Sequence, residues 1–244
     1  MKTALITGAS RGLGLALARQ LAQMGWRLVV NARGAEALDS ARREMSSWTQ
    51  VQAIAGDVTD PELRNALAEA TRGFGGLDAV INNASALGPS PQPKLIDYPL
   101  DVLVHVYQMN VIAPLGILQA VADQLKPGAR IVNVTSDAAF EAYAGWGGYG
   151  SSKSALAQWS QIFAVEHPQW RVYWVDPGDM RTQMHQEAFP GEDISDRPLP
   201  ETSVPGFLAL LEGDYASGRY AARDLGTSLP SGTPSFQLTQ TLVM

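Results

Sequence analysis

The chain has 244 residues, a length that fits one large domain or two small ones. Hydrophobic residues make up 45% of it and charged residues 17%, so it can bury a sizeable core, which argues against disorder. The net charge of −6 and the lack of a basic stripe argue against nucleic-acid binding. The chain has no cysteine and only three histidines, so a thiolate nucleophile is excluded and we expect no bound metal.

Membrane and targeting signals are weak in this sequence. No uninterrupted apolar run reaches the roughly 18 residues of a membrane span. The apolar stretch after Met1 is shorter than a signal peptide requires, and Gly8 interrupts it. We therefore expect a cytoplasmic protein without membrane contact, whose partner is a small-molecule substrate.

Short apolar or β-branched runs alternate with longer helical patterns along the chain. Strands are expected at 3–7, 27–31, 51–55, 79–82, 130–135 and 171–175. Helices are expected at 14–24, 35–46, 61–71, 101–125 and 151–166. This alternation predicts an α/β fold: a single Rossmann-like, doubly wound domain whose mostly parallel sheet carries helices on both faces.

No internal repeat or Ser/Gly linker divides the chain. We expect one domain over residues 1–225, including a substrate loop or lid at about 183–200, where three prolines and several acids interrupt the periodicity. Residues 226–244 are rich in Ser, Thr, Gly and Pro. They read equally well as a flexible C-terminal tail or as an arm that packs on a partner subunit.

The first strand leads into a glycine-rich turn, TGASRGLG, at residues 7–14. Gly8, Gly12 and Gly14 allow a tight turn and a close approach of the backbone to a pyrophosphate. The helix that follows directs its free N–H groups and its positive end at such an anion. The alternative is a glycine-rich turn without a ligand, but its position at the first strand-to-helix junction favours dinucleotide binding.

The end of the second strand bears on the choice of dinucleotide. Folds that bind NAD usually carry a carboxylate there to hold the ribose 2′-hydroxyl. In this chain the first acid is Glu36, whereas Arg33 ends the strand and Arg11 lies in the glycine turn. Two guanidinium groups can bind a 2′-phosphate, so we favour NADP (as NADPH), with NAD possible and a purely solvated Arg33 as the alternative.

A tyrosine and a lysine are spaced for acid–base chemistry. Tyr149 and Lys153 lie four residues apart, on one face if the segment is helical. A cation beside a phenol lowers its pKa, so we expect Tyr149 to move protons near neutral pH. Ser136 follows the fifth strand, at the sheet edge where ligands bind, although a serine there also suits a helix N-cap.

Together these motifs resemble the short-chain dehydrogenase/reductase family. The matching positions run in order over about residues 1–182: 7–14, Asp57-Val58, 82–84, Asn110, Ser136, Tyr149 with Lys153, and Pro177-Gly178 with Thr182. The resemblance implies four catalytic residues: Asn110, Ser136, Tyr149 and Lys153. With Arg33 added from the argument above, the cofactor-binding set is Gly8, Ser10, Arg11, Gly12, Leu13, Gly14, Arg33, Asp57, Val58, Asn83, Tyr149, Lys153, Pro177, Gly178 and Thr182.

The resemblance also implies a role for each position at the nucleotide. Asp57 and Val58 would contact the adenine, and Asn83 would line the cofactor cleft. Thr182 would reach the nicotinamide carboxamide. Lys153 would bind the nicotinamide ribose.

At the reacting end, Asn110 would sit at a local break in its helix and hold a water in a proton relay to Lys153. Ser136 would orient the substrate carbonyl and Tyr149 would move the proton. Two positions depart from the family pattern: Ser85 stands where glycine is usual, and Asp176 adds a carboxylate before Pro177.

We therefore expect an NADP-dependent oxidoreductase that reduces a ketone or aldehyde to an alcohol, or runs the reverse reaction. A non-catalytic NADP-binding sensor or scaffold on the same fold is the main alternative. A nucleotide-sugar epimerase is disfavoured because a long C-terminal substrate domain is lacking. Six residues were candidates for an apolar substrate lining, with core or subunit contacts as the alternative: Leu87, Phe140, Tyr143, Trp146, Met180 and Met184.

Apolar positions on the two long helices exceed what the sheet needs. They are Leu103, Val106, Tyr107, Trp159 and Phe163. Some of them would form a helix-on-helix face, and with the family resemblance this predicts a homodimer or homotetramer. Trp159 reads equally well as an ordinary core residue.

Overall fold

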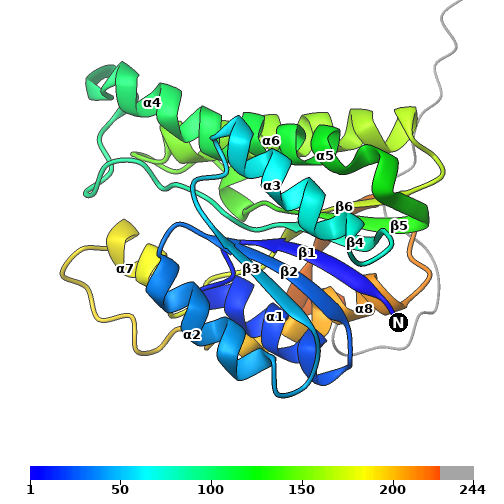
Figure 1. Cartoon of the computed structure of the whole chain (residues 1–244). Helices are drawn as coiled ribbons and strands as arrows, with labels where there is room; N and C mark the ends of the chain where they lie inside the picture. The colour runs from blue at the N-terminus through cyan, green and yellow to red at the C-terminus, as the bar shows by residue number, and fades with distance from the viewer. Residues whose placement is uncertain (226–244) are drawn as a thin grey trace, which may run out of the picture.

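Seven parallel strands form one sheet in the order β3-β2-β1-β4-β5-β6-β7 (Figure 1). The computed structural model describes residues 1–225, and the predicted tail or arm at 226–244 lies outside them. The strands are β1 Thr3–Thr7, β2 Arg27–Ala32, β3 Val51–Ala55, β4 Leu77–Asn82, β5 Leu125–Val134, β6 Arg171–Asp176 and β7 Gly218–Ala221. The strand order reverses between β1 and β4, which opens a crevice at their carboxyl ends.

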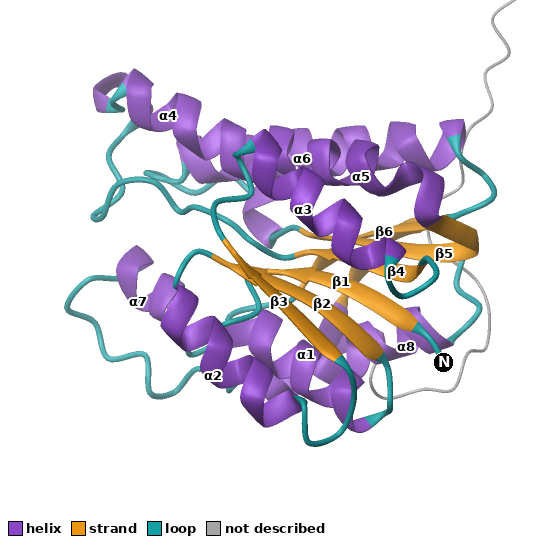
Figure 2. Cartoon of the chain, viewed as in Figure 1, coloured by secondary structure: helices purple, strands orange, loops and turns teal. Residues whose placement is uncertain are grey.

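Helices cover both faces of the sheet (Figure 2). One layer holds α1 Gly12–Gln23, α2 Ala35–Met45 and α8 Val204–Glu212. The other holds α3 Pro61–Arg72, α4 Leu100–Tyr107, α5 Ala113–Val121 and α6 Gly147–Glu166. The short helices α7 Gln183–Ala188 and α9 Ala222–Leu225 follow β6 and β7. The predicted doubly wound α/β fold is confirmed.

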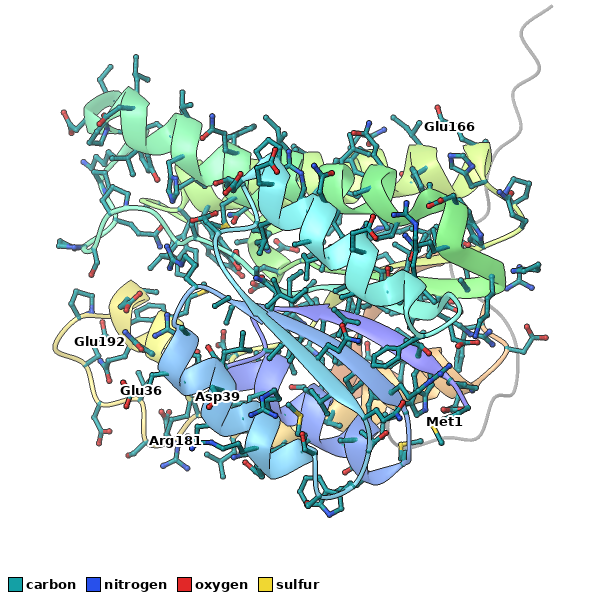
Figure 3. The ribbon with its side chains drawn as sticks, in the orientation of Figure 1. Met1, Glu36, Asp39, Glu166, Arg181 and Glu192 are labelled. Atoms are coloured by element: carbon teal, nitrogen blue, oxygen red, sulfur yellow. The ribbon has the colours of Figure 1, made fainter. Side chains whose placement is uncertain are left out.

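The strands are apolar on both faces because both faces are buried. All five residues of β1 are buried. Successive side chains of this strand point alternately toward the two helix layers, so Leu5 packs in one core cluster and Ile6 in the other. In β2, Val29 and Val30 divide in the same way. Charged side chains such as Glu36 on α2 and Glu166 on α6 lie on the outside of the layers (Figure 3).

The segment Leu100–Gln124 is helical but not one regular α-helix. A π-helical turn at Gln108–Ile112 separates α4 from α5. By length and composition alone, this segment is apolar enough to cross a membrane. Here Val106, Met109 and Ala113 are buried within the fold, so its apolar character also serves the packing of the helix.

Three elements near the C-terminal end of the described chain were not predicted: α8, β7 and the four-residue helix α9. The strand β7 has only four residues, Gly218–Ala221, and lies at the sheet edge, where no continuous apolar run is required. The helix α8 starts at Val204-Pro205-Gly206, a sequence that reads as a breaker. Gly206 is needed because a Cβ there would lie 2.1 Å from the carbonyl oxygen of Ala222.

The segment expected as a loop at 183–200 begins instead with the six-residue helix α7. Thr182 caps this helix by accepting a hydrogen bond from the backbone N–H of His185. The segment then returns to its start, since the N–H of Arg181 donates to the carbonyl of Pro198 over 2.8 Å. The expected loop or lid thus begins with a short capped helix, which the Thr182 cap stabilises and the weak periodicity concealed.

Candidate active site

The glycine turn after β1 is built so closely that two of its glycines cannot carry a side chain. Gly8 has φ +68°, and a Cβ on Gly14 would lie 2.3 Å from the carbonyl oxygen of Gly8. A Cβ on Gly8 would lie 2.7 Å from Nδ2 of Asn83. The turn therefore presents bare backbone at the crevice, as a pyrophosphate site requires.

Asn83 acts on this turn from the end of β4. Its side-chain amide donates to the carbonyl oxygens of Thr7 and Gly8 over 2.9 and 3.2 Å. The backbone N–H groups of Asn83 and Ala84 both donate to the Thr7 hydroxyl over 3.0 Å. Asn83 thus holds the glycine turn against the neighbouring strand and lies in the crevice where it was expected.

The first turn of α1 is available to an anion. Its N-cap residue, Arg11, makes no side-chain capping bond, and no acid occupies the first turn. The Arg11 guanidinium donates to the side chain of Gln183 on α7. Leu13 is buried in the core, whereas Ser10 is half-buried in the turn.

Beyond β2 and β3 lie the residues expected at the adenosine end. Arg33 is exposed. Burial raises the pKa of Asp57, but hydrogen bonds from the backbone and hydroxyl of Thr59, together with the charges of Arg33 and His105, lower it below its usual value. Val58 is buried in the core. Arg33 and Asp57 are thus close enough to interact, and the Asp57 carboxylate stays ionised.

At the carboxyl ends of β5 and β6 is an open cavity with about 550 Å³ of empty space, part of it in contact with solvent. Its walls combine polar and apolar groups from four chain segments. The lining residues are Leu87, Thr135, Ser136, Asp137, Trp146, Tyr149, Asp176, Pro177, Gly178, Asp179, Met180, Thr182, Met184, His185 and Ala188. A few converging polar groups on an otherwise apolar wall are typical of a small-molecule site.

Ser136 and Tyr149 meet in this cavity because the start of α6 packs directly on the turn after β5. A Cβ on Gly150 would lie 2.6 Å from the carbonyl oxygen of Ala138, so glycine is needed for the close approach. Ser136 is the N-cap of the turn at Asp137–Ala139, as the alternative interpretation expected, and its hydroxyl donates to Asp137 over 2.8 Å. A hydrogen bond with Ser136 also lowers the pKa of the Tyr149 phenol.

Lys153 lies one helical turn beyond Tyr149 and is 2% exposed. Its Nζ donates to the carbonyl oxygen of Val134 over 2.8 Å and lies 5.5 Å from the centroid of the Tyr149 ring. Burial lowers the pKa of Lys153 to about 7. The two side chains therefore share one helix face, as the spacing predicted.

The pKa of Tyr149 does not follow the sequence-based expectation. Burial raises the pKa of this phenol above its ordinary value of 10, and the carboxylates of Asp176 and Asp137 raise it further. Hydrogen bonds with Ser136 and Ser85 act in the opposite direction but are weaker. For the protein groups alone, the direction is therefore opposite to the one expected from Lys153, because burial disfavours the phenolate and the Asp176 and Asp137 carboxylates repel it.

Asn110 lies in the π-helical turn, so the expected local break in its helix is confirmed. Its Oδ1 accepts from the N–H of Ala86 over 2.8 Å and from the Ser85 hydroxyl over 3.1 Å. Its Nδ2 donates to the carbonyl of Ala86 and to the hydroxyl of Ser152, each over 2.9 Å. Asn110 thus joins the chain after β4 to the residue that precedes Lys153.

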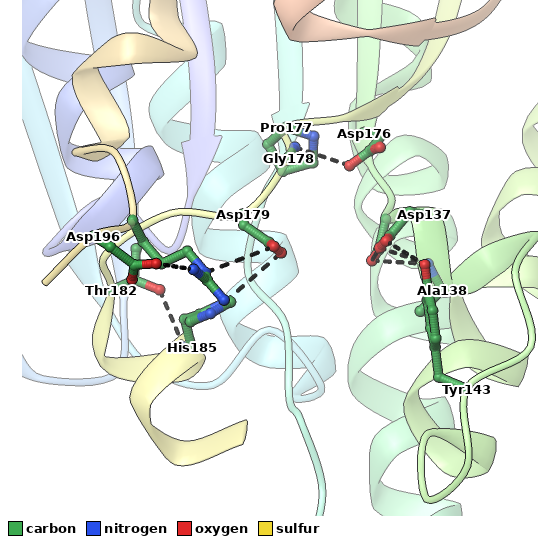
Figure 4. A network of polar contacts seen from close by, with 12 residues as sticks. Asp137, Ala138, Tyr143, Asp176, Pro177, Gly178, Asp179, Thr182, His185 and Asp196 are labelled. Atoms are coloured by element: carbon green, nitrogen blue, oxygen red, sulfur yellow. Dashed lines mark hydrogen bonds and ion pairs between the residues drawn. The ribbon is translucent and has the colours of Figure 1, made fainter. Parts of the chain in front are cut away.

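The turn after β6 carries Asp176 into the cavity wall (Figure 4). The N–H of Gly178, which has φ +76°, donates to its carboxylate over 2.9 Å. The carbonyl of Pro177 accepts a hydrogen bond from Ser203. Thr182 lies beside the glycine turn, with its methyl carbon 3.5 Å from where a Cβ of Gly12 would stand. The cavity and the glycine turn are therefore neighbours.

The apolar lining was predicted in part. Leu87, Trp146, Met180 and Met184 line the cavity. Phe140 and Tyr143 are not among its lining residues and are about half exposed. Phe140 faces the guanidinium of Arg219 on β7 instead, and the Tyr143 hydroxyl donates to Asp137 over 3.0 Å. A pattern of nearby aromatic residues could not reveal these partners.

Four polar residues of the cavity were missed by the sequence analysis: Thr135, Asp137, Asp179 and His185. Asp137 follows Ser136 directly, which was the one local signal available. Asp179 and His185 lie beyond the Pro177-Gly178 turn, where the backbone direction decides what faces the cavity. Within residues 1–225, no group of three or more His, Cys, Asp and Glu residues is arranged to hold a metal.

Comparisons with known proteins agree with this geometry. The sequence model of the family described as short chain dehydrogenase matches residues 2–193. A hydroxynaphthalene reductase-like protein from Metarhizium brunneum is 33% identical over 247 residues, covering 89% of this chain and 91% of the relative.

Two solved structures show the same fold with a nucleotide. A short chain dehydrogenase from Shigella flexneri, complexed with NADP, has a TM-score of 0.85 and 29% identity, with 91% of this chain and 97% of that chain covered. One from Escherichia coli, complexed with NADPH, has a TM-score of 0.81 and 28% identity, with coverage of 91% and 96%. The chain therefore belongs to the short-chain dehydrogenase family of NAD(P)-dependent oxidoreductases.

Proposed function

We propose that this oxidoreductase uses NADP(H) to interconvert a carbonyl compound and its alcohol, with Tyr149 as the proton-transferring group. The observation that carries the proposal is that Ser136 and Tyr149 line one cavity, which lies beside the glycine turn. The names of the related reductase and the NADP complexes among structural neighbours support the same reaction class.

The residues present fit a dinucleotide. A side chain on Gly14 would collide with the turn, so the crevice floor is bare backbone, and the start of α1 keeps its N–H groups free of side-chain caps. We propose that the nucleotide phosphates lie there and that Thr182 and the Pro177-Gly178 turn hold the nicotinamide end. When bound, the cofactor supplies the hydride.

The protein groups then bind and protonate the substrate oxygen. We propose that Ser136 and Tyr149 hydrogen-bond the carbonyl oxygen and stabilise the charge that develops on it. Because burial and nearby carboxylates raise the pKa of Tyr149, this phenol holds its proton at neutral pH and can give it only to a more basic atom, such as the substrate oxygen once negative charge has developed on it. Lys153 would bind the nicotinamide ribose, and Asn110 would hold the water of the proton relay.

For the nucleotide, we propose a preference for NADP over NAD. Arg33 is exposed at the end of β2, and the acidic residue nearest to it in the chain, Glu36, lies in the first turn of α2. Arg11 lies on the glycine turn after the neighbouring strand β1 and is also exposed. A 2′-phosphate between these guanidinium groups would form charge-assisted hydrogen bonds.

The first experiment separates an enzyme from a sensor. Wild-type protein is assayed for NADPH oxidation with a panel of ketones and aldehydes, and Tyr149→Phe is assayed alongside. We expect turnover by the wild type and a loss of about 100-fold or more in kcat for the variant, the usual range for a general acid. NADPH binding, measured by fluorescence, should be retained. Equal turnover of both proteins would refute the role of Tyr149, and NADPH binding without turnover of any compound would favour the sensor.

The second experiment tests the preference for NADPH over NADH. Arg33→Ala should weaken NADPH binding about tenfold or more and leave NADH binding little changed, since one charge-assisted hydrogen bond contributes about 1.5–3 kcal/mol. Arg43→Ala, on the exposed side of α2, is the control for loss of an arginine. Equal affinities of wild type for NADPH and NADH would contradict the preference.

We also propose that residues 1–225 are one domain and that the enzyme is a homodimer or homotetramer in the cytoplasm. Val104, Ile112, Ile162 and Val165 on the long helices are exposed apolar residues that suit subunit contact. Trp159 and Phe163 are partly buried and pack against the core, which for Trp159 agrees with the alternative interpretation. Sedimentation velocity of the full chain tests the assembly.

A further inference from the structure

His185 lines the cavity but has no place in the reaction described above. Its side chain is only 10% exposed. Its ring packs on Phe189, with centroids 4.9 Å apart, and its Nδ1 lies 3.9 Å from Oδ1 of Asp179. Its Nε2 is buried and has no hydrogen-bond partner among the described residues. A buried nitrogen without a partner is unfavourable, so a ligand group that forms a hydrogen bond with it gains binding energy.

The surroundings decide which kind of group His185 can bind. Of the two neutral tautomers of the His185 ring, the one with its proton on Nδ1 is preferred because that nitrogen faces the Asp179 carboxylate, and in this tautomer Nε2 is an acceptor. The missing partner is therefore a hydrogen-bond donor. The ring is held in place by Phe189 and by the Thr182 cap of its own backbone N–H.

The rest of the polar wall points to an uncharged donor. Asp137, Asp176 and Asp179 all line the cavity, so a carboxylate or phosphate on the substrate would be repelled. In Figure 4, Asp179 lies beside His185, and Asp137 lies beside Tyr143 on a different segment of the chain. Asp137 already accepts from Ser136, Ala138 and Tyr143. Among the described residues of this wall, two buried polar atoms have no partner, Oγ1 of Thr135 and Nε2 of His185, and of these only the ring nitrogen is an acceptor that cannot also donate.

We propose that His185, oriented by Asp179, forms a second polar subsite that accepts a hydrogen bond from a hydroxyl group of the substrate. The substrate class is then a hydroxylated ketone or aldehyde without negative charge. This inference rests on the proposed function, since the carbonyl of the same molecule lies at Ser136 and Tyr149.

The test compares matched substrates in matched variants. Cyclohexanone and its 2-, 3- and 4-hydroxy derivatives are reduced with NADPH by wild type, His185→Phe and His185→Gln. Phenylalanine keeps the packing on Phe189 but removes both nitrogens, whereas glutamine keeps a hydrogen-bonding group. The control is His167→Phe, since His167 packs on Phe163 and Trp170 away from the cavity lining.

We expect the wild type to prefer at least one hydroxy derivative over cyclohexanone. In His185→Phe the ratio of the two kcat/KM values should fall about tenfold, chiefly through KM, as expected for one hydrogen bond. His185→Gln should retain part of the preference, and His167→Phe all of it. The same ratio in wild type and His185→Phe, or no preference in the wild type, would overturn the subsite.

Equilibrium binding separates this inference from the proposed reaction. Tyr149→Phe with bound NADP is titrated with cyclohexanone and each hydroxy derivative by calorimetry, with and without His185→Phe. A preference that disappears with His185 supports the subsite even if the wild type turns over none of these compounds, in which case only the proposed reaction fails. Absence of any preference, or of any binding, overturns the subsite.

Discussion

Replacing Lys153 by methionine tests how burial controls the charge at the site. Methionine keeps most of the apolar stem and cannot be protonated. Burial lowers the pKa of Lys153 from 10.5 to about 7. Below pH 7 the side chain is protonated in both the folded and the unfolded chain, and the folded state contains a buried ammonium. Between pH 7 and 10.5 the folded chain has lost this proton while the unfolded chain retains it.

In this interval the free energy of unfolding contributed by Lys153 increases with pH, by about 1.4 kcal/mol per pH unit. The contribution is complete above pH 10.5, the pKa of Lys153 in the unfolded chain, and it is lost as the pH falls through about 7, the pKa of Lys153 in the folded chain. From pH 7.5 to 9.5 the stability of wild type should therefore rise by about 3 kcal/mol relative to Lys153→Met. Loss of the hydrogen bond to Val134 adds a constant difference that does not depend on pH.

The assay is urea unfolding without added nucleotide, followed by tryptophan fluorescence at several pH values in that interval. Subtracting the free energy of unfolding of the variant from that of the wild type cancels the contributions of all other titrating groups. Lys94→Met, at an exposed position, is the control for loss of a lysine and should give a flat difference. A flat difference for Lys153→Met as well would refute the argument that this lysine folds into the core with a lowered pKa.

Two further variants test the remaining parts of the site. In Asp176→Asn the loss of a carboxylate that raises the pKa of Tyr149 should move the pH profile of alcohol oxidation to lower pH, and an unchanged midpoint would contradict the charge coupling. Gly14→Ala should lower the midpoint of thermal unfolding by several degrees and abolish NADPH binding, because the new Cβ would lie 2.3 Å from the Gly8 carbonyl oxygen. The control is Gly34→Ala, whose Cβ meets nothing within 4 Å and whose stability should be unchanged.

Much of the fold follows from local patterns. The strand 51–55 was predicted with its observed bounds, and most other elements begin or end within a few residues of the prediction. The reason is that a parallel strand covered on both faces must be apolar throughout, while its crossover helix repeats at 3.6 residues, and these two patterns differ clearly. The part beyond β6 was less predictable, because the four-residue β7 and the capped turn α7 are stabilised by contacts that no local pattern reports.

The sequence by itself determined the doubly wound fold, the glycine turn and the pairing of Tyr149 with Lys153, since each depends on residue types at short spacings. Only the tertiary structure decided the electrostatics of the cavity. Asp137, Asp176 and His185 come from separate segments and meet because the carboxyl ends of β5 and β6 lie side by side. A pKa depends on burial and on charges that are near in space, so the raised pKa of Tyr149 could not be deduced from its neighbours in the chain.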